Sequence, residues 1–233
     1  MDIVKSTLQA VRERIARAAD LAGRAAEEVS LLAVSKTYQA AAVRTLALQG
    51  QRDFGESYLQ EATDKMDALA DLDLCWHFIG PIQRNKTTQI AENFHWVHSV
   101  DRLIVAQRLA AARPNIRVAL NICLQVNISA EVSKSGVAPR AAAELAAQVS
   151  RLPGLRLRGL MGIAQATGDI ALQRAQFAQL RHCYADLNRQ GMRLDTLSMG
   201  MSNDMEAAIA EGATIVRVGT ALFGPRTKRT LRI

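Results

Sequence analysis

The sequence has little cysteine and few aromatic residues, and each shortage excludes a class of protein. Its three cysteines, Cys75, Cys123 and Cys183, stand far apart in a chain of 233 residues. An odd number of widely spaced cysteines forms neither a disulfide framework nor a zinc motif and is typical of reduced thiols. Aromatic residues make up only 4% of the chain, so no row of rings is present on which bases could stack. We therefore expect no disulfide framework, no metal site and no nucleic acid partner.

Long apolar runs are also missing. Polar residues interrupt every apolar stretch before it reaches the length of a membrane span, and residues 1–5 lack the layout of a secretory signal. These features predict a cytoplasmic protein without a membrane segment. The formal net charge is +7, but the basic residues are spread over the chain and the densest cluster is the terminal segment 226–232. Such a charge can attract small anionic ligands without identifying them.

Short apolar runs alternate with longer amphipathic runs along the chain. A leading helix is predicted at about 3–22, where apolar residues recur at helical spacing. The apolar runs that follow predict eight strands, at 29–36, 52–56, 75–80, 96–100, 119–128, 155–163, 195–200 and 214–219. Helices are predicted between them, at 39–49, 57–70, 83–93, 101–112, 138–151, 170–190 and 203–211.

This alternation of strands and helices predicts the α/β class with parallel strands. Eight strands favour a closed (β/α)8 TIM barrel over the alternative, an open doubly wound sheet. No Pro- or Ser-rich linker divides the sequence, so residues 1–233 are expected to form a single domain. In such a barrel, the functional face is built from the loops that follow the strands.

Lys36 closes the first predicted strand and therefore belongs to that face. If its side chain points into the barrel, Leu32 and Val34 point inward as well. This apolar floor would favour the neutral amine, which is the nucleophilic form of lysine. On the strand alone, a lysine with its ammonium group in solvent is an equally good interpretation.

Two glycine-containing motifs follow the last two predicted strands, at 198–202 and 217–220. Phosphate sites in barrels recur between the loops after strands seven and eight. Close backbone approach and hydroxyl groups at Ser202, Gly219 and Thr220 therefore predict a phosphate site. Taken alone, the first motif is explained equally by a capped helix.

The helix predicted at 203–211 has two candidate N-caps, Ser202 and Asn203. Glu206 stands three residues after Asn203, the spacing of a capping box. We expect one of these two residues to cap the helix.

Arg217 shares one face of its strand with Ile215 and Gly219, while Val216 and Val218 occupy the other face. The valines suit packing against helices, which sends Arg217 into the barrel, where it needs an acceptor. A buried carboxylate and a pyridine nitrogen are the two alternatives. Arginine stays protonated and would leave such a nitrogen without its own proton, which restrains decarboxylation and transamination. Lysine together with a phosphate site suggests an aldehyde-bearing phosphorylated cofactor held as a Schiff base.

Other features carry less information. His77 stands near a strand end, where a satisfied core histidine is the simpler interpretation. Lys134 follows the fifth strand and is either a transient acceptor for the cofactor or a solvated lysine. Met161, Met199 and Met201 either line a ring pocket or fill gaps in the core.

Several sequence blocks resemble the pyridoxal phosphate homeostasis protein family, also called YggS or PROSC proteins. Each block is short, but they follow in the family's order over nearly the whole chain, at 31–37, 54–61, 76–80, 133–136, 157–161, 198–202 and 216–224.

The resemblance implies a barrel similar to the amino-terminal domain of alanine racemase, the fold-type III class. It implies pyridoxal 5'-phosphate (PLP) as a Schiff base on Lys36, phosphate contacts from Ser202, Gly219 and Thr220, and a contact from Arg217 to the pyridine nitrogen. No catalytic residue is implied, and the expected cofactor-binding set is Lys36, Ser57, Met161, Met199, Ser202, Arg217, Gly219 and Thr220.

The resemblance also implies a role. Family members carry or buffer PLP and support vitamin B6 and amino-acid/keto-acid homeostasis without an established turnover, and PLP-dependent apoenzymes are the expected recipients. The alternative is a racemase-like PLP enzyme, which needs acid/base groups on both faces of its substrate. In alanine racemase one of these groups comes from a further domain and a partner subunit, and we expect no such domain here. A monomer is expected, because no apolar seam is apparent.

Two positions depart from the family pattern. Ser57 stands where the family has asparagine in the block Gly-Glu-Asn, so a ring contact from this position is expected to differ. Residues 162–169 replace a proline-containing turn, so this loop is expected to have a different shape.

Overall fold

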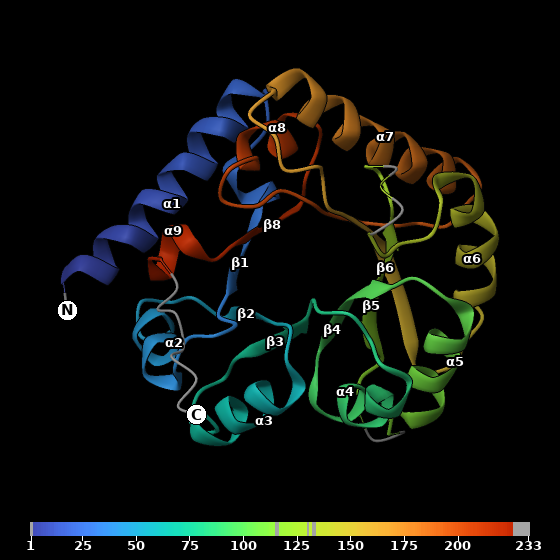
Figure 1. Ribbon diagram of the computed structural model, residues 1–233, viewed down its shortest axis with the longest axis horizontal. Helices are drawn as coiled ribbons and strands as arrows, with labels where there is room; N and C mark the ends of the chain where they lie inside the picture. The colour runs from blue at the N-terminus through green and yellow to red at the C-terminus, as the bar shows by residue number, and fades with distance from the viewer. Residues whose placement is uncertain (1, 115–116, 130, 132–133, 226–233) are drawn as a thin grey trace.

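Eight parallel strands form a closed barrel with helices around it in the computed structural model (Figure 1). The structure describes residues 2–114, 117–129, 131 and 134–225. Neighbouring strands pair in chain order, and the last strand, β8 (Ile215–Val218), pairs with the first, β1 (Ser30–Val34). The predicted (β/α)8 barrel is thus confirmed. The basic segment 226–232 lies outside the described residues.

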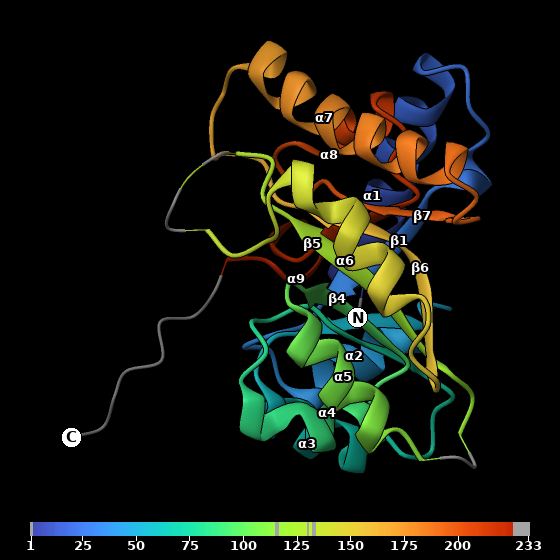
Figure 2. The same cartoon turned by 90° about the vertical axis from the view of Figure 1, so that its right-hand side faces the viewer.

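The other strands are short and evenly distributed: β2 (Asp53–Glu56), β3 (Cys75–Phe78), β4 (Trp96–Val100), β5 (Leu120–Val126), β6 (Leu155–Gly162) and β7 (Thr196–Ser198). The α-helices are α1 (Asp2–Leu21), α2 (Ala40–Ala47), α3 (Leu59–Ala68), α4 (Thr87–Asn93), α5 (Leu103–Ala112), α6 (Ala142–Val149), α7 (Ile170–Arg189), α8 (Met205–Ala210) and α9 (Thr220–Phe223). The described residues also form the 3-10 turns η1 (Ala26–Glu28), η2 (Arg84–Lys86) and η3 (Pro139–Ala141). Figure 2 shows α4, α5, α6 and α7 in succession along one side of the barrel.

The predicted elements differ from the observed ones mainly at their ends. The first strand was predicted to reach Lys36 but ends at Val34, and Lys36 lies in the turn that follows. The helices predicted at 83–93 and 138–151 begin as the 3-10 turns η2 and η3 before α4 and α6 start. The four-residue helix α9 was not predicted, because so short a segment shows no periodicity.

The leading helix α1 packs on the outside of the barrel, beside α8 and α9 (Figure 1). Its residues Leu8, Val11, Ile15 and Ala18 are all buried, as the helical spacing indicated. No helix in the described part of the chain has the length and apolar character that crossing a bilayer requires.

Two regions of the interior differ in character. Between strands and helices the core is apolar and contains the fully buried rings of Phe54, Phe94 and Phe177. Inside the barrel, where branched apolar residues are usual, several buried side chains are polar and bond to one another across the strands: His77, His98, Ser198 and Arg217.

One glycine in the barrel wall marks a close approach of two strands. A Cβ atom at Gly159 in β6 would lie 1.7 Å from the carbonyl oxygen of Thr196 in β7. Because the obstacle is backbone, Gly159→Ala should destabilise the fold by about 3 kcal/mol, as measured by chemical denaturation. Gly168→Ala is the matched control, because nothing lies within 4 Å of that position. Equal unfolding free energies for the two variants would contradict this strand geometry.

Candidate functional site

A cavity of about 870 Å³ is lined by the loops that follow the barrel strands, on the predicted face. Lys36 and Tyr38 approach it from the loop after β1, and residues 163–168 approach it from the loop after β6. Residues 201–204 line it after β7, and Gly219 and Thr220 line it after β8. Six of the eight predicted site residues line this cavity: Lys36, Met161, Ser202, Arg217, Gly219 and Thr220.

The other two predicted residues, Ser57 and Met199, do not line the cavity. Ser57 is half-buried, and its backbone packs closely on Gly80. A Cβ atom added at Gly80 would lie 2.3 Å from the Ser57 carbonyl oxygen. Met199 is fully buried and belongs to the apolar core, whereas Met201 lines the cavity and is 39% exposed. Of the two alternatives for the methionines, Met199 thus fills the core.

Lys36 lies in a turn of constrained backbone. The next residue, Thr37, has a φ of 72°, a left-handed conformation that is unfavourable for a β-branched residue. The Thr37 amide donates a hydrogen bond of 2.5 Å to Oε1 of Glu61 in α3. Strained backbone persists only where its surroundings hold it, so this bond helps to fix the turn that carries Lys36.

A buried ion cluster holds the other side of the same turn. Nζ of Lys65 in α3 donates to the Ser35 carbonyl oxygen at 2.7 Å, and to Oε1 of both Glu56 and Glu61 at 2.6 Å. Oγ of Ser35 also donates to Glu56 at 2.7 Å. Burial raises the pKa of Glu56, although the ammonium group of Lys65 opposes the shift. One lysine and two carboxylates therefore tie the main chain on both sides of Lys36 to α3.

Arg217 points into the barrel as predicted and is 5% exposed. Its Nη1 donates to the carbonyl oxygen and to Oγ of Ser198 at 2.6 and 2.8 Å, and its Nη2 donates to the Gly162 carbonyl oxygen at 2.9 Å. These acceptors are neutral, and burial lowers the pKa of Arg217 to about 10, which leaves it protonated at neutral pH. A guanidinium group has five N–H groups, so within the described residues three are used and two can serve a ligand.

The loop after β7 differs from the prediction in its cap. Asp204, rather than Ser202 or Asn203, is the N-cap of α8, and its side chain does not cap the helix. Instead, Oδ1 of Asp204 accepts a hydrogen bond of 2.5 Å from the Met201 amide, because the chain makes one further turn before the helix begins. The predicted cap was therefore wrong, although Ser202 still lines the cavity.

Lys134 and His77 lie outside the large cavity. Lys134 lines an adjacent cavity of about 250 Å³, pairs with Glu131, and donates to the Ala164 carbonyl oxygen at 3.3 Å. His77 is buried and bonds to Asp53 and His98, so the simpler interpretation, a satisfied core histidine, fits its position.

The ion cluster behind Lys36 should contribute strongly to stability. Lys65→Met leaves two carboxylates beside an apolar side chain and should cost about 3–5 kcal/mol of unfolding free energy. The cost should shrink as the pH falls, because the Glu56 carboxyl, whose pKa is raised by burial, takes up a proton more readily once Lys65 no longer opposes that shift. Arg44→Met, which removes an exposed pair with Asp71, is the control and should cost less than about 1 kcal/mol. Chemical denaturation measures both, and similar small losses would contradict the role of Lys65.

Comparisons with known proteins agree with this geometry. The family model for the alanine racemase N-terminal domain matches residues 6–227. A pyridoxal phosphate homeostasis protein of Pseudomonas aeruginosa is 59% identical over 226 residues, which are 97% of this chain and 97% of that protein.

Solved structures give the same result. PipY of Synechococcus elongatus PCC7942, solved with PLP bound, is 42% identical with a TM-score of 0.79, over 90% of this chain and 100% of that chain. An alanine racemase of Clostridium difficile 630 has a TM-score of 0.76 at 14% identity, over 98% of this chain and 58% of that chain, and shows the shared fold alone. The extent of these matches, together with the cavity at the predicted face, shows that this chain belongs to the pyridoxal phosphate homeostasis protein family.

Proposed function

We propose that this chain binds PLP in the 870 Å³ cavity and carries or buffers it, with Lys36 as the residue that forms a reversible Schiff base. The observation that carries the proposal is that Lys36 and Arg217, which come from opposite ends of the sequence, line one cavity together with the loops after β7 and β8. PLP bound to PipY supports the same ligand for this related chain.

The phosphate would lie between the loops after β7 and β8. Ser202 offers a hydroxyl group there, and Gly219 and Thr220 begin the short helix α9. Gly219 packs closely on β1, since a Cβ atom at this position would lie 3.2 Å from the Val34 carbonyl oxygen. This close packing lets the chain pass β1 and reach the cavity with its amides, where they can donate to a phosphate.

Arg217 would hold the pyridine nitrogen. It is a buried cation whose hydrogen-bond acceptors in the described residues are neutral, and it has N–H groups left to donate. Because arginine keeps its proton, the nitrogen would accept a hydrogen bond and stay unprotonated. PLP owes its power in carbanion chemistry to its role as an electron sink, and an unprotonated ring is a weak one. Arg217 therefore favours storage over turnover.

The Lys36 amine would perform the reversible covalent step. Its condensation with the aldehyde forms one C=N bond and releases one water molecule, and hydrolysis restores the free amine and the aldehyde. Val34, Ile79 and Met161 supply apolar surface in the cavity, which favours the neutral, nucleophilic amine. Release would follow either from hydrolysis or from transfer to another amine.

The biological role that we infer is the supply of PLP. The protein would hold PLP when it is abundant and release it to PLP-dependent apoenzymes, which supports vitamin B6 and amino-acid/keto-acid homeostasis. We propose that residues 1–233 act as a single PLP-binding domain and as a monomer.

The Schiff base can be tested directly. Purified protein incubated with PLP should absorb visible light, and borohydride reduction should add the mass of the reduced cofactor to the peptide that contains Lys36. Lys36→Ala should lose both signals and keep its far-UV circular dichroism. Lys86→Ala changes an exposed lysine and should keep both. Reduced cofactor on a different lysine of the wild type would refute the assignment.

The alternative function is amino-acid racemisation. It requires acid/base groups on both faces of the substrate. Three titratable residues of the described lining are committed to other contacts or charge states: the Tyr38 hydroxyl donates to the Gly224 carbonyl oxygen at 2.5 Å, Asp204 accepts from Met201, and Arg217 stays protonated. This arrangement favours a carrier.

Chiral chromatography separates the two functions. After incubation of the PLP-loaded protein with L-alanine or D-alanine, we expect no inversion above a control that contains free PLP. Rapid formation of the other enantiomer would instead establish a racemase.

A further inference from the structure

A chain of hydrogen bonds crosses the barrel interior and ends at Arg217. Asp53 Oδ1 lies 3.1 Å from His77 Nε2, and His77 Nδ1 lies 2.9 Å from His98 Nε2. His98 Nδ1 lies 2.8 Å from Ser198 Oγ, which accepts a bond of 2.8 Å from Nη1 of Arg217. The chain links β2, β3, β4, β7 and β8, and the proposed function does not use four of its five members.

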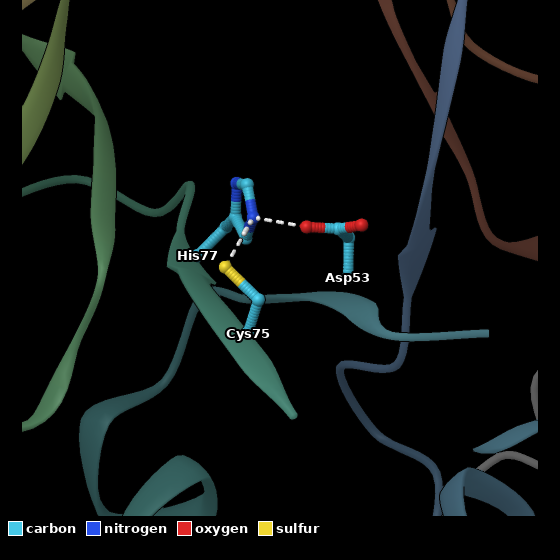
Figure 3. Close-up of side chains that lie close together, drawn as sticks. All are labelled: Asp53, Cys75 and His77. Atoms are coloured by element: carbon cyan, nitrogen blue, oxygen red, sulfur yellow. Dashed lines mark hydrogen bonds and ion pairs between the residues drawn. The ribbon is translucent and has the colours of Figure 1, made fainter. Parts of the chain in front are cut away.

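The far end of the chain lies at the barrel mouth opposite the PLP cavity. Asp53 begins β2 and Cys75 begins β3, and the amino ends of parallel strands gather at one mouth. Figure 3 shows the carboxylate of Asp53 and the sulfur of Cys75 beside the same ring nitrogen of His77. The Asp53 side chain is 41% exposed, whereas that of His77 is 3% exposed.

The two end groups of this row of hydrogen bonds, Asp53 and Arg217, decide which atom is the donor in each bond. An ionised carboxylate only accepts, so His77 Nε2 must carry a proton. Neutral His77 then accepts at Nδ1 from His98 Nε2, and neutral His98 accepts at Nδ1 from the Ser198 hydroxyl. Arginine only donates, and Ser198 receives that donation on a lone pair. Donors and acceptors thus alternate from Arg217 to Asp53.

The charge states that this pattern needs agree with the surroundings. Burial lowers the pKa of His77 and lowers that of His98 well below its ordinary value, so both rings are neutral. Burial opposes ionisation of Asp53, but hydrogen bonding to His77 and to Cys75 gives a net lowering of the Asp53 pKa. Cys75 and Asp73 also lie near this end, and Arg12, Glu27 and Arg52 line a cavity together with Asp53.

We propose that Asp53 is a remote positioning residue for PLP binding: through His77, His98 and Ser198 it holds Arg217 in the orientation that donates to the cofactor. The inference rests on the proposed function. If the Ser198 proton is committed to His98, the serine oxygen offers its lone pairs to Nη1 of Arg217. The Nη1 side of the guanidinium group is then held by Ser198 in the barrel wall, which leaves the remaining N–H groups of Arg217 to point towards the cavity.

A metal ion bound by Asp53, Cys75 and His77 is the competing explanation of the same cluster. Their donor atoms lie within 4.8 Å of one another, and these residue types bind zinc. Zinc would occupy the lone pair of His77 Nε2, so that His77 would carry its proton on Nδ1 and every hydrogen bond from His77 to Ser198 would run in the opposite direction. Among the described residues, the Ser198 hydroxyl proton would then lack an acceptor, since His98 Nδ1 would itself donate to Ser198 Oγ and Arg217 only donates. Burial also raises the pKa of Cys75 to about 12, which favours the thiol.

Histidine tautomers test the direction of the chain without PLP. In uniformly 15N-labelled protein, long-range 1H–15N spectra near neutral pH should show the Nε2–H tautomer for both His77 and His98. Asp53→Leu should remove this preference, Asp53→Asn should keep it through its amide oxygen, and Asp71→Leu, an exposed control, should not change it. Nδ1–H tautomers in the wild type would overturn the proposal. So would a switch to Nδ1–H at His77 after addition of zinc chloride, which would establish the metal site.

PLP dissociation tests the consequence. Stopped-flow release into a trap apoenzyme should be about tenfold faster for Asp53→Leu than for the wild type, whereas Asp53→Asn should stay within about twofold. Far-UV circular dichroism checks that both variants fold. Equal release rates for a folded Asp53→Leu variant with altered tautomers would overturn the inference. Failure of the wild type to bind PLP would instead refute the proposed function, and the tautomer result distinguishes the two cases.

Discussion

The pairing of β8 with β1 is the contact on which the rest of the structure depends. It closes the barrel and sets Arg217 opposite Leu32 in register, two residues before the first strand ends. Lys36 therefore leaves the barrel wall just above the strand that carries Arg217, although 181 positions separate them in the sequence (217 − 36). The loops after β7 and β8 follow on the same side. Closure thus builds a place where an amine, a guanidinium group and anion-binding amides can act on one ligand.

The polar residues inside the barrel support this site. Within the described residues, Arg217 is a buried cation whose hydrogen-bond acceptors are neutral, and burying such a group is costly unless its N–H groups are satisfied. Ser198 and Gly162 satisfy part of it, and Ser198 is in turn held by His98. The residues that support the site therefore reach deeper into the barrel than the cavity lining. Apolar side chains usually fill a barrel interior, but here a row of hydrogen-bonded polar side chains takes their place.

The backbone around Lys36 is likewise held by polar contacts, which lie on the outer side of the barrel. The left-handed conformation of Thr37 has an energetic cost, and the bond to Glu61 and the buried Lys65 offset it. Arg217 and Lys36 are thus each held by an ordered polar network, one inside the barrel and one between barrel and helices.

The sequence predicted the strands, the inward direction of Arg217 and the face that carries the cavity, because these follow from local alternation and periodicity. It did not predict the partners of Lys65 or the hydrogen bonds that run through His98, because those contacts join distant positions. His98 and Ser198, for example, are 100 residues apart. The N-cap of α8 was missed for a local reason, an extra turn at 202–204. The most direct test of the account is the 15N chemical shift of the pyridine nitrogen in protein loaded with 15N-labelled PLP. The account predicts the shift of an unprotonated nitrogen that accepts a hydrogen bond, and the shift of a pyridinium ion would contradict it.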